Sequence, residues 1–212
     1  MRSYIETNRL KGGLYMKKVI ITIGREFGSG GREIGLKLAQ KLNIPFYDKE
    51  LIAHTAEKIN VEHSIIERYD EQHSFPAFSS SNIFDIYQMP MSDRIYIAQA
   101  DVIRDLAKKE SCIIVGRCAD YILKDEPELF SVFIHAPMKD KVERKKALLP
   151  EKSDSELESH IKKINKKRSR YYTYYTDRTW GESFTYNLSI DSSILGIDGT
   201  VDLIVNAVNM RK

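Results

Sequence analysis

Three glycines within four residues, flanked by two arginines, form the part of the sequence best suited to chemistry. Gly28, Gly30 and Gly31 follow Arg25 and precede Arg32. Glycines let the backbone approach an anion closely, and guanidinium groups match the geometry of phosphate oxygens. The pattern therefore favours a phosphate site. A merely tight turn and a dinucleotide site are the two alternatives.

The spacing departs from both common glycine motifs. A P-loop needs two glycines five residues apart, followed by lysine and then serine or threonine. Here Arg25 stands at the first glycine, and Gly31 and Arg32 stand at the lysine and the hydroxyl residue. The dinucleotide motif fails at its third glycine, where Glu33 stands, although Asp48 follows at the distance expected for its acidic residue.

A strand and a helix must hold this turn. Residues 19–23 form a β-branched run of the kind found in buried parallel strands. Ile34, Leu38 and Leu42 then recur at helical spacing, which predicts a helix that begins near Gly30. The start of such a helix presents backbone N–H groups and the positive end of its dipole to an anion.

Other polar residues follow short apolar runs further along the chain. Asp48, Arg117 and His135 each stand just after such a run. The carboxyl ends of parallel strands lie at one edge of a sheet, where α/β proteins bind ligands. Asp48 suits a helix cap equally well, and a structural role is the stronger interpretation of His135.

A basic helix is predicted near the C-terminal third of the chain. Ser153 and Glu156 form a capping box at its start, and six cations lie between residues 162 and 170, followed by four tyrosines and Trp180. Three interpretations stay open: a solvated helix face, a clamp on a small phosphate ligand, and a polyanion site with stacking aromatics. The rest of the chain favours the clamp over the polyanion site.

Strands alternate with helices along the chain, which predicts a parallel three-layer α/β sandwich. The predicted strands cover residues 19–23, 44–47, 112–115, 129–134 and 186–190, and the later helices cover 93–109, a segment from 153 and 198–208. Residues 1–16 are expected to be a disordered extension, and 17–212 a single domain.

The composition is that of an ordinary globular chain. The 212 residues are 42% hydrophobic and 30% charged, with a net charge of +3, too small to indicate nucleic-acid binding. No long apolar run or signal peptide is evident, so we expect a cytoplasmic protein without a membrane span. Two cysteines and scattered histidines predict no structural metal site.

Taken together, several segments resemble the cytidylate kinase-like family, relatives of the bacterial cytidylate kinases among the nucleoside monophosphate kinases. The resemblance runs from about Lys17 to the C-terminus and is carried by IGREFGSGGREIG, IPFYDKEL, IVGRCADYIL, FIHAP, KKRSRYYTYYT and SIDSSILGID. It implies a P-loop kinase sheet in the order 2-3-1-4-5, an excursion over about residues 48–92 that binds the monophosphate, and a lid over about 147–180. It also implies transfer of the γ-phosphoryl group of ATP to CMP or dCMP with Mg²⁺.

The resemblance also implies roles for individual residues. The donor phosphates would lie against Arg25 and the turn from Gly28 to Arg32, including Ser29. Asp48, Arg104, Arg117 and Asp120 would bind the acceptor, with Asp120 in place of an acid that the family has where Cys118 stands. The catalytic cations would be Arg32, Arg168 and Arg170. No residue is assigned as a metal ligand.

The altered turn leaves more than one function open. The family has lysine at the position of Gly31 and a hydroxyl residue shortly after it, whereas this chain has Arg32 and Glu33 there. A kinase with modified P-loop chemistry is favoured, ahead of a nucleotide-binding regulatory protein without turnover and a polyanion-binding protein. Small-molecule nucleotides are the expected partners, not nucleic acid, and the chain is expected to be a monomer or weak dimer.

Overall fold

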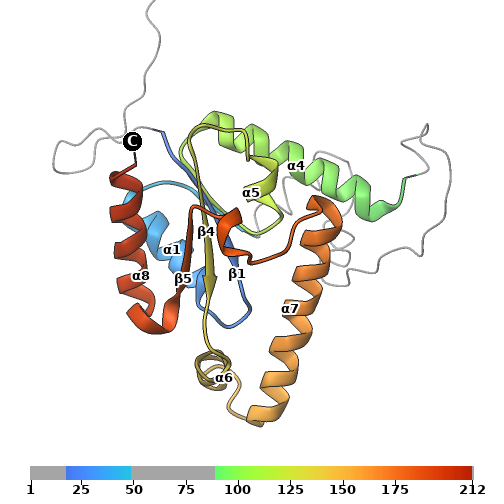
Figure 1. Ribbon diagram of the computed structural model, residues 1–212, viewed down its shortest axis with the longest axis vertical. Helices are drawn as coiled ribbons and strands as arrows, with labels where there is room; N and C mark the ends of the chain where they lie inside the picture. Colours follow the sequence, from blue (N-terminus) through green and yellow to red (C-terminus); the bar gives the residue numbers. More distant parts are fainter. Residues whose placement is uncertain (1–17, 49–88, 212) are drawn as a thin grey trace, which may run out of the picture.

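A computed structural model describes residues 18–48 and 89–211 (Figure 1). The expected N-terminal extension and most of the expected excursion, with the helix that Asp48 would cap, lie outside the described residues. Within the described part of the chain, no helix has the length and apolar character that a membrane span requires.

The sheet has five parallel strands in the order β2-β3-β1-β4-β5. This confirms both the fold class and the strand order expected from the sequence. The strands are β1 (Ile20–Arg25), β2 (Phe46–Tyr47), β3 (Cys112–Val115), β4 (Leu129–His135) and β5 (Leu188–Asp191). The central strand β1 lies between β3 and β4, so the glycine turn that follows it lies at the middle of the carboxyl edge.

Helices cover both faces of the sheet, as the three-layer prediction requires. One face of β1, with Ile21 and Ile23, packs with residues of α1 and α8, while Ile20 packs with Ile103 and Leu123 on the other face. Figure 1 shows α1 and α8 on one side of the strands and α4 and α5 on the other. These helices are α1 (Gly31–Leu42), α4 (Met91–Lys109), α5 (Ala119–Ile122) and α8 (Ser192–Asn209).

The remaining helices lie near the carboxyl edge of the sheet. They are α6 (Met138–Lys146), α7 (Asp154–Thr176) and the short 3-10 helix η2 (Ser183–Thr185). Figure 1 shows α6 beyond the end of β4, and α7 as a long helix that rises from there. Residues 154–176 of the expected lid therefore form one continuous helix of 23 residues.

Element boundaries differ from the sequence predictions in several places, and two of the differences have a clear physical cause. The second strand keeps only Phe46–Tyr47, because Pro45 has no N–H group to donate to a ladder. α8 starts six residues before the predicted Asp198, since the Asp191 carboxylate accepts from Ser193 N–H at 2.9 Å and caps it. That helix contains a break at Gly196, where φ is 65°.

The predicted capping box at the start of α7 is present. Ser153 Oγ accepts from the Glu156 backbone N–H at 3.3 Å, and Ser153 N–H donates to Glu156 Oε2 at 2.8 Å. These bonds satisfy two donors that the helix itself leaves without acceptors.

Loss of the cap should destabilise the fold. Ser153→Ala should lower the free energy of unfolding by about 1 kcal/mol, or the melting temperature by roughly 2 to 4 °C. Ser155→Ala, an exposed position in the first turn of the same helix, is the matched control. Equal melting temperatures for the two variants, measured by circular dichroism, would contradict the role of the cap.

Candidate active site

A cavity of about 500 Å³ opens at the carboxyl ends of β1 and β3. Its volume is within the range typical of small-molecule sites. Four cationic side chains line it, Arg25, Arg117, Lys167 and Arg168. Aromatic side chains form much of the rest of the wall, namely Phe27, Tyr171, Tyr172, Trp180 and Tyr186. The cavity thus combines positive charge with flat apolar surfaces.

Arg25 is the last residue of β1, and its side chain crosses the floor of the site. Its stem passes beneath Gly31, and its guanidinium group packs against Gly116 at the end of β3. Burial and the neighbouring Arg168 lower the pKa of Arg25 to about 9, whereas Asp48 opposes this effect. The group therefore remains a cation at neutral pH.

Arg117 enters the cavity from a strained turn. Gly116, Arg117 and Cys118 all have positive φ, at 77°, 57° and 54°. Left-handed backbone is costly for residues other than glycine and is concentrated at functional sites. Burial lowers the pKa of Arg117, while Tyr171 and Asp48 act in the opposite direction. The left-handed backbone of this turn therefore lowers the stability of the fold, and it holds the Arg117 cation in a partly buried position.

Asp48 is the carboxylate that the arginines share. It follows β2 and is only 8% exposed, and its Oδ2 accepts from Arg32 Nε at 2.5 Å. Its charge also raises the pKa values of Arg25, Arg117 and Arg168. Among the described residues, Asp48 thus pairs with Arg32 and acts electrostatically on three further guanidinium groups. The Arg32 side chain is 57% exposed and does not line the cavity.

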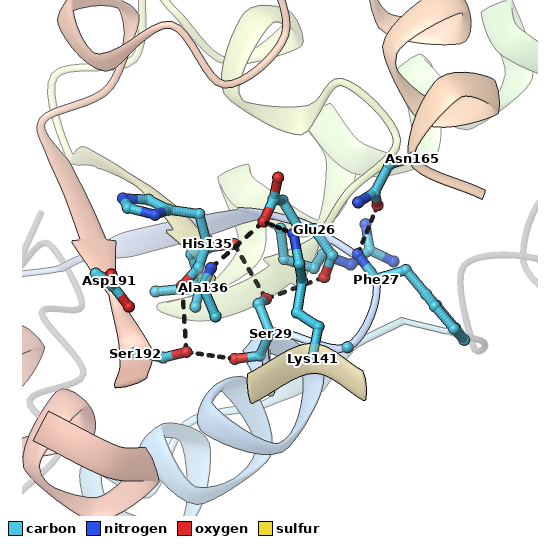
Figure 2. Close-up of polar contacts among 12 residues, drawn as sticks. Glu26, Phe27, Ser29, His135, Ala136, Lys141, Asn165, Asp191 and Ser192 are labelled. Atoms are coloured by element: carbon cyan, nitrogen blue, oxygen red, sulfur yellow. Dashed lines mark hydrogen bonds and ion pairs between the residues drawn. The ribbon is translucent and has the colours of Figure 1, made fainter. Parts of the chain in front are cut away.

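Arg168 joins α7 to the end of β1. Its Nη1 donates to the carbonyl oxygen of Arg25 at 2.9 Å, and burial, followed by Arg117, lowers its pKa to about 10. Nearby, the Phe27 backbone N–H donates to Asn165 Oδ1 at 2.7 Å (Figure 2). Arg170, two residues further along the helix, is exposed and does not line the cavity among the described residues. The structure thus separates the two arginines that the sequence grouped together.

The glycine turn itself presents unused donors. The hydrogen bonds among the described residues give no acceptor to the backbone N–H groups of Gly28, Gly30 and Gly31. Arg144 Nη1 donates to the carbonyl oxygen of Gly28 at 2.8 Å and supports the turn from α6. N–H groups without an acceptor among the described residues, at the start of a 12-residue helix and beside Arg32, can bind an anion such as phosphate.

Ser29 does not fit a role as a magnesium ligand. Its side chain is 0% exposed, and its Oγ donates to the carbonyl oxygens of Glu26, at 3.0 Å, and Ile134, at 3.1 Å (Figure 2). In residues 18–48 and 89–211 no group of three or more His, Cys, Asp and Glu side chains could hold a metal ion.

A partly buried ion pair beside the turn could not be predicted from the sequence. Lys141 Nζ of α6 lies 2.7 Å from Glu26 Oε2, which also accepts from the Ala136 backbone N–H at 3.3 Å (Figure 2). The Lys141 side chain is 6% exposed. Lys141 is one of several basic residues in α6, so no local pattern marked it; only the fold brings it to Glu26.

The structure places the remaining predicted residues in two different settings. Arg104 is exposed on α4 and lies 3.3 Å from Asp101 Oδ1, outside the lining of the cavity. Asp120 lines the cavity and is buried, and its Oδ2 accepts from Tyr172 O–H at 2.6 Å. Burial raises the pKa of Asp120, while the bond from Tyr172 opposes this.

The aromatic residues after the basic helix segment are mostly packed inward. Tyr171, Tyr172 and Trp180 face the cavity, and the Tyr175 ring stacks on Tyr96 with centroids 3.9 Å apart. Only Tyr174, at 54%, is strongly exposed among the four tyrosines. This arrangement favours a bounded site for a small ligand over an open surface for a polyanion.

The raised pKa of Asp120 predicts a pH-dependent stability. An acid whose pKa is higher in the folded state stabilises the fold most below its unfolded value, here 3.8, and that contribution is lost as the pH rises through the folded pKa. Wild type should therefore lose stability relative to Asp120→Asn as the pH rises above 3.8 and through the raised folded-state pKa. Urea unfolding at several pH values measures the difference, with exposed Asp125→Asn as control. If the difference in unfolding free energy between wild type and Asp120→Asn stays the same at every pH, the pKa of Asp120 is not raised.

Comparisons with known proteins agree with this fold. The chain matches a crystal structure of an uncharacterized protein from Eubacterium ventriosum with a TM-score of 0.71 and 32% identity, covering 92% of this chain and 100% of that one. Shikimate kinase from Bacteroides thetaiotaomicron matches with a TM-score of 0.54 and 17% identity over 91% and 99% of the two chains. Shikimate kinase from Acinetobacter baumannii, in complex with shikimate, matches at 0.52 and 13% over 92% and 97%.

These two kinases show the P-loop kinase fold alone, because their identities are low. No match was found among curated protein sequences. The model of the cytidylate kinase-like family, in contrast, matches residues 20–194, which include the glycine turn, the cavity and α7. The chain therefore belongs to the cytidylate kinase-like family.

Proposed function

We propose that this protein transfers the γ-phosphoryl group of ATP to a nucleoside monophosphate, with CMP or dCMP as the favoured acceptor. The observation that carries the proposal is the convergence of Arg25, Arg117 and Arg168 in an aromatic-walled cavity beside the glycine turn. Family membership supports a phosphotransferase of small molecules. The choice of a cytidine nucleotide rests on the resemblance of the sequence.

In this proposal the cavity binds the acceptor. A monophosphate carries nearly two negative charges at neutral pH, which the cations Arg25 and Arg117 would offset. The base and sugar would lie among the aromatic side chains, close to Asp120 and Asp48. Because the attacking phosphate oxygen is already ionised, the reaction needs no general base. The chain's task is then positioning and charge stabilisation, as in other phosphoryl transfers.

The donor phosphates would lie along the glycine turn. Backbone N–H groups of Gly28, Gly30 and Gly31 and the Arg32 side chain would hold them, and Arg168 would reach them from α7. Magnesium normally supplies charge neutralisation in such reactions and is commonly held by substrate phosphates. We expect it to be bound through the nucleotide.

A regulatory protein that binds nucleotides without turnover is the second candidate. It is favoured by one observation: Ser29, the hydroxyl residue within the turn, is fully buried and hydrogen-bonded to carbonyl oxygens. Both candidates place a small-molecule nucleotide in the same cavity, and neither needs a nucleic acid. Both also suit the cytoplasm, where ATP is available and thiols such as those of Cys112 and Cys118 remain free.

A turnover assay separates the two candidates. The full chain is incubated with ATP and Mg²⁺ and, in turn, CMP, dCMP, UMP, AMP, GMP and shikimate, and the phosphorylated acceptor is identified by mass spectrometry. We expect kcat/KM to be highest for CMP or dCMP. ATP binding without product from any acceptor would favour the regulatory candidate. If shikimate were the only compound phosphorylated, the proposal of a nucleoside monophosphate as acceptor would be wrong.

The two arginines assigned to the acceptor from sequence should differ in effect. Arg117→Met should weaken CMP binding by roughly tenfold to a hundredfold, since a charge-assisted contact contributes about 1.5 to 3 kcal/mol. Arg104→Met should weaken it much less, because Arg104 is exposed and already faces Asp101. Calorimetry measures both, with exposed Lys139→Met as the control for loss of a cation. Equal losses of CMP affinity in the Arg104 and Arg117 variants would show that Arg104 also contributes to acceptor binding.

A further inference from the structure

In the glycine turn, the Arg25 side chain fills the space that a side chain at position 31 would need. A Cβ atom added at Gly31 would lie 2.6 Å from Arg25 Cβ and 3.1 Å from Arg25 Cγ. Carbon atoms in proteins do not approach so closely, so no side chain fits at position 31 while Arg25 keeps its place. The lysine that a P-loop requires at position 31 is therefore excluded by an atom close to the backbone, which cannot move aside like the end of a flexible chain.

The P-loop pattern contains the opposite pair of residues. It has glycine where this chain has Arg25 and lysine where this chain has Gly31. In that pattern the small residue precedes the turn and the cation follows it. Here the cation stands at position 25, before the turn, and the glycine stands at position 31 within it. The absence of the lysine at position 31 and the presence of Arg25 are thus sterically linked.

Neighbouring residues hold both the backbone and the guanidinium group of Arg25 in place. Its backbone is held in the sheet opposite Ile134 of β4, and its carbonyl oxygen accepts from Arg168. Its guanidinium group lies so close to Gly116 that a Cβ atom there would be 2.0 Å from Arg25 Nη1. The group is therefore locked between the glycine turn and Arg117, where donor and acceptor phosphates would meet.

We propose that Arg25 is the cation that contacts the transferred phosphoryl group, in place of the lysine that position 31 cannot hold. This inference rests on the proposed function. In the reaction an acceptor oxygen forms a bond to the γ-phosphorus while the bond from that phosphorus to the bridging oxygen breaks, and its electron pair leaves with ADP. Arg25 neutralises charge on the equatorial oxygens during this exchange, and no proton is transferred to or from it.

The first test measures stability and does not depend on activity. Gly31→Lys alone should lower the melting temperature by roughly 3 to 10 °C, as overpacking does. In an Arg25→Gly background the same change should cost little, because the space is free. In an Arg25→Ala background the full cost should remain, since alanine keeps the Cβ atom that lies closest to position 31. Additive effects in all backgrounds would overturn the steric exclusion.

The second test measures the cation's role. Arg25→Met keeps the stem of the side chain and removes the charge; it should lower kcat by about a hundredfold to a thousandfold at saturating substrates. The double variant Arg25→Gly with Gly31→Lys, which has the P-loop pair, should have at least tenfold higher kcat than Arg25→Gly. Unchanged turnover in Arg25→Met, or no recovery in a folded double variant, would overturn the role.

Binding of inorganic pyrophosphate separates this inference from the proposed function. If wild type has no turnover with any acceptor, calorimetry still compares wild type, Arg25→Met and the double variant. A tenfold or greater loss in Arg25→Met, with recovery in the double variant, would support Arg25 as the phosphate cation although the kinase proposal fails. Equal pyrophosphate affinity in all three proteins would overturn the inference itself.

Discussion

The repulsion among Arg25, Arg117 and Arg168 is the constraint on which the site depends. These guanidinium groups lie in a partly buried crevice, where water screens their charges poorly and Asp48 offsets only part of them. Such an arrangement costs stability in the free protein. Binding of an anion with two or more charges, as proposed above, would relieve this repulsion.

The fold holds these like charges together by attaching each arginine to a separate rigid element. Arg25 ends the central strand, Arg117 follows the neighbouring strand through a left-handed turn, and Arg168 belongs to a 23-residue helix. Hydrogen bonds from α7 to the backbone of Arg25 and Phe27 join the helix to the sheet. The backbone positions that carry the three side chains therefore stay close together unless β1, β3 or α7 moves, although electrostatic repulsion between the guanidinium groups acts to separate them.

Much of the fold could be predicted from the sequence, because β-branched runs, helical spacing and the capping box are local signals, and the strand order came with the family resemblance. The glycine turn and the polar residue Asp48 at a strand end were found in the same way. The exposed position of Arg104 and the pairing of Lys141 with Glu26 were not, because they depend on which face of a helix meets the sheet. The separation of Arg168 from Arg170 has a similar cause: residues two apart on a helix point in nearly opposite directions, and only the packed structure shows which one faces the cavity.

The exclusion of side chains at Gly31 by Arg25 also limits how this turn could have arisen and how it is recognised in other genomes. Consider an ancestor with glycine at position 25 and lysine at position 31. If arginine appears first at position 25, it collides with the lysine. If the lysine is lost first, the turn has no cation. Either order passes through an impaired intermediate, so we expect the two positions to change together across homologous sequences. A search pattern that requires the lysine would overlook such proteins; one that requires a single bulky cation at either of the two positions, and glycine at the other, would retain them.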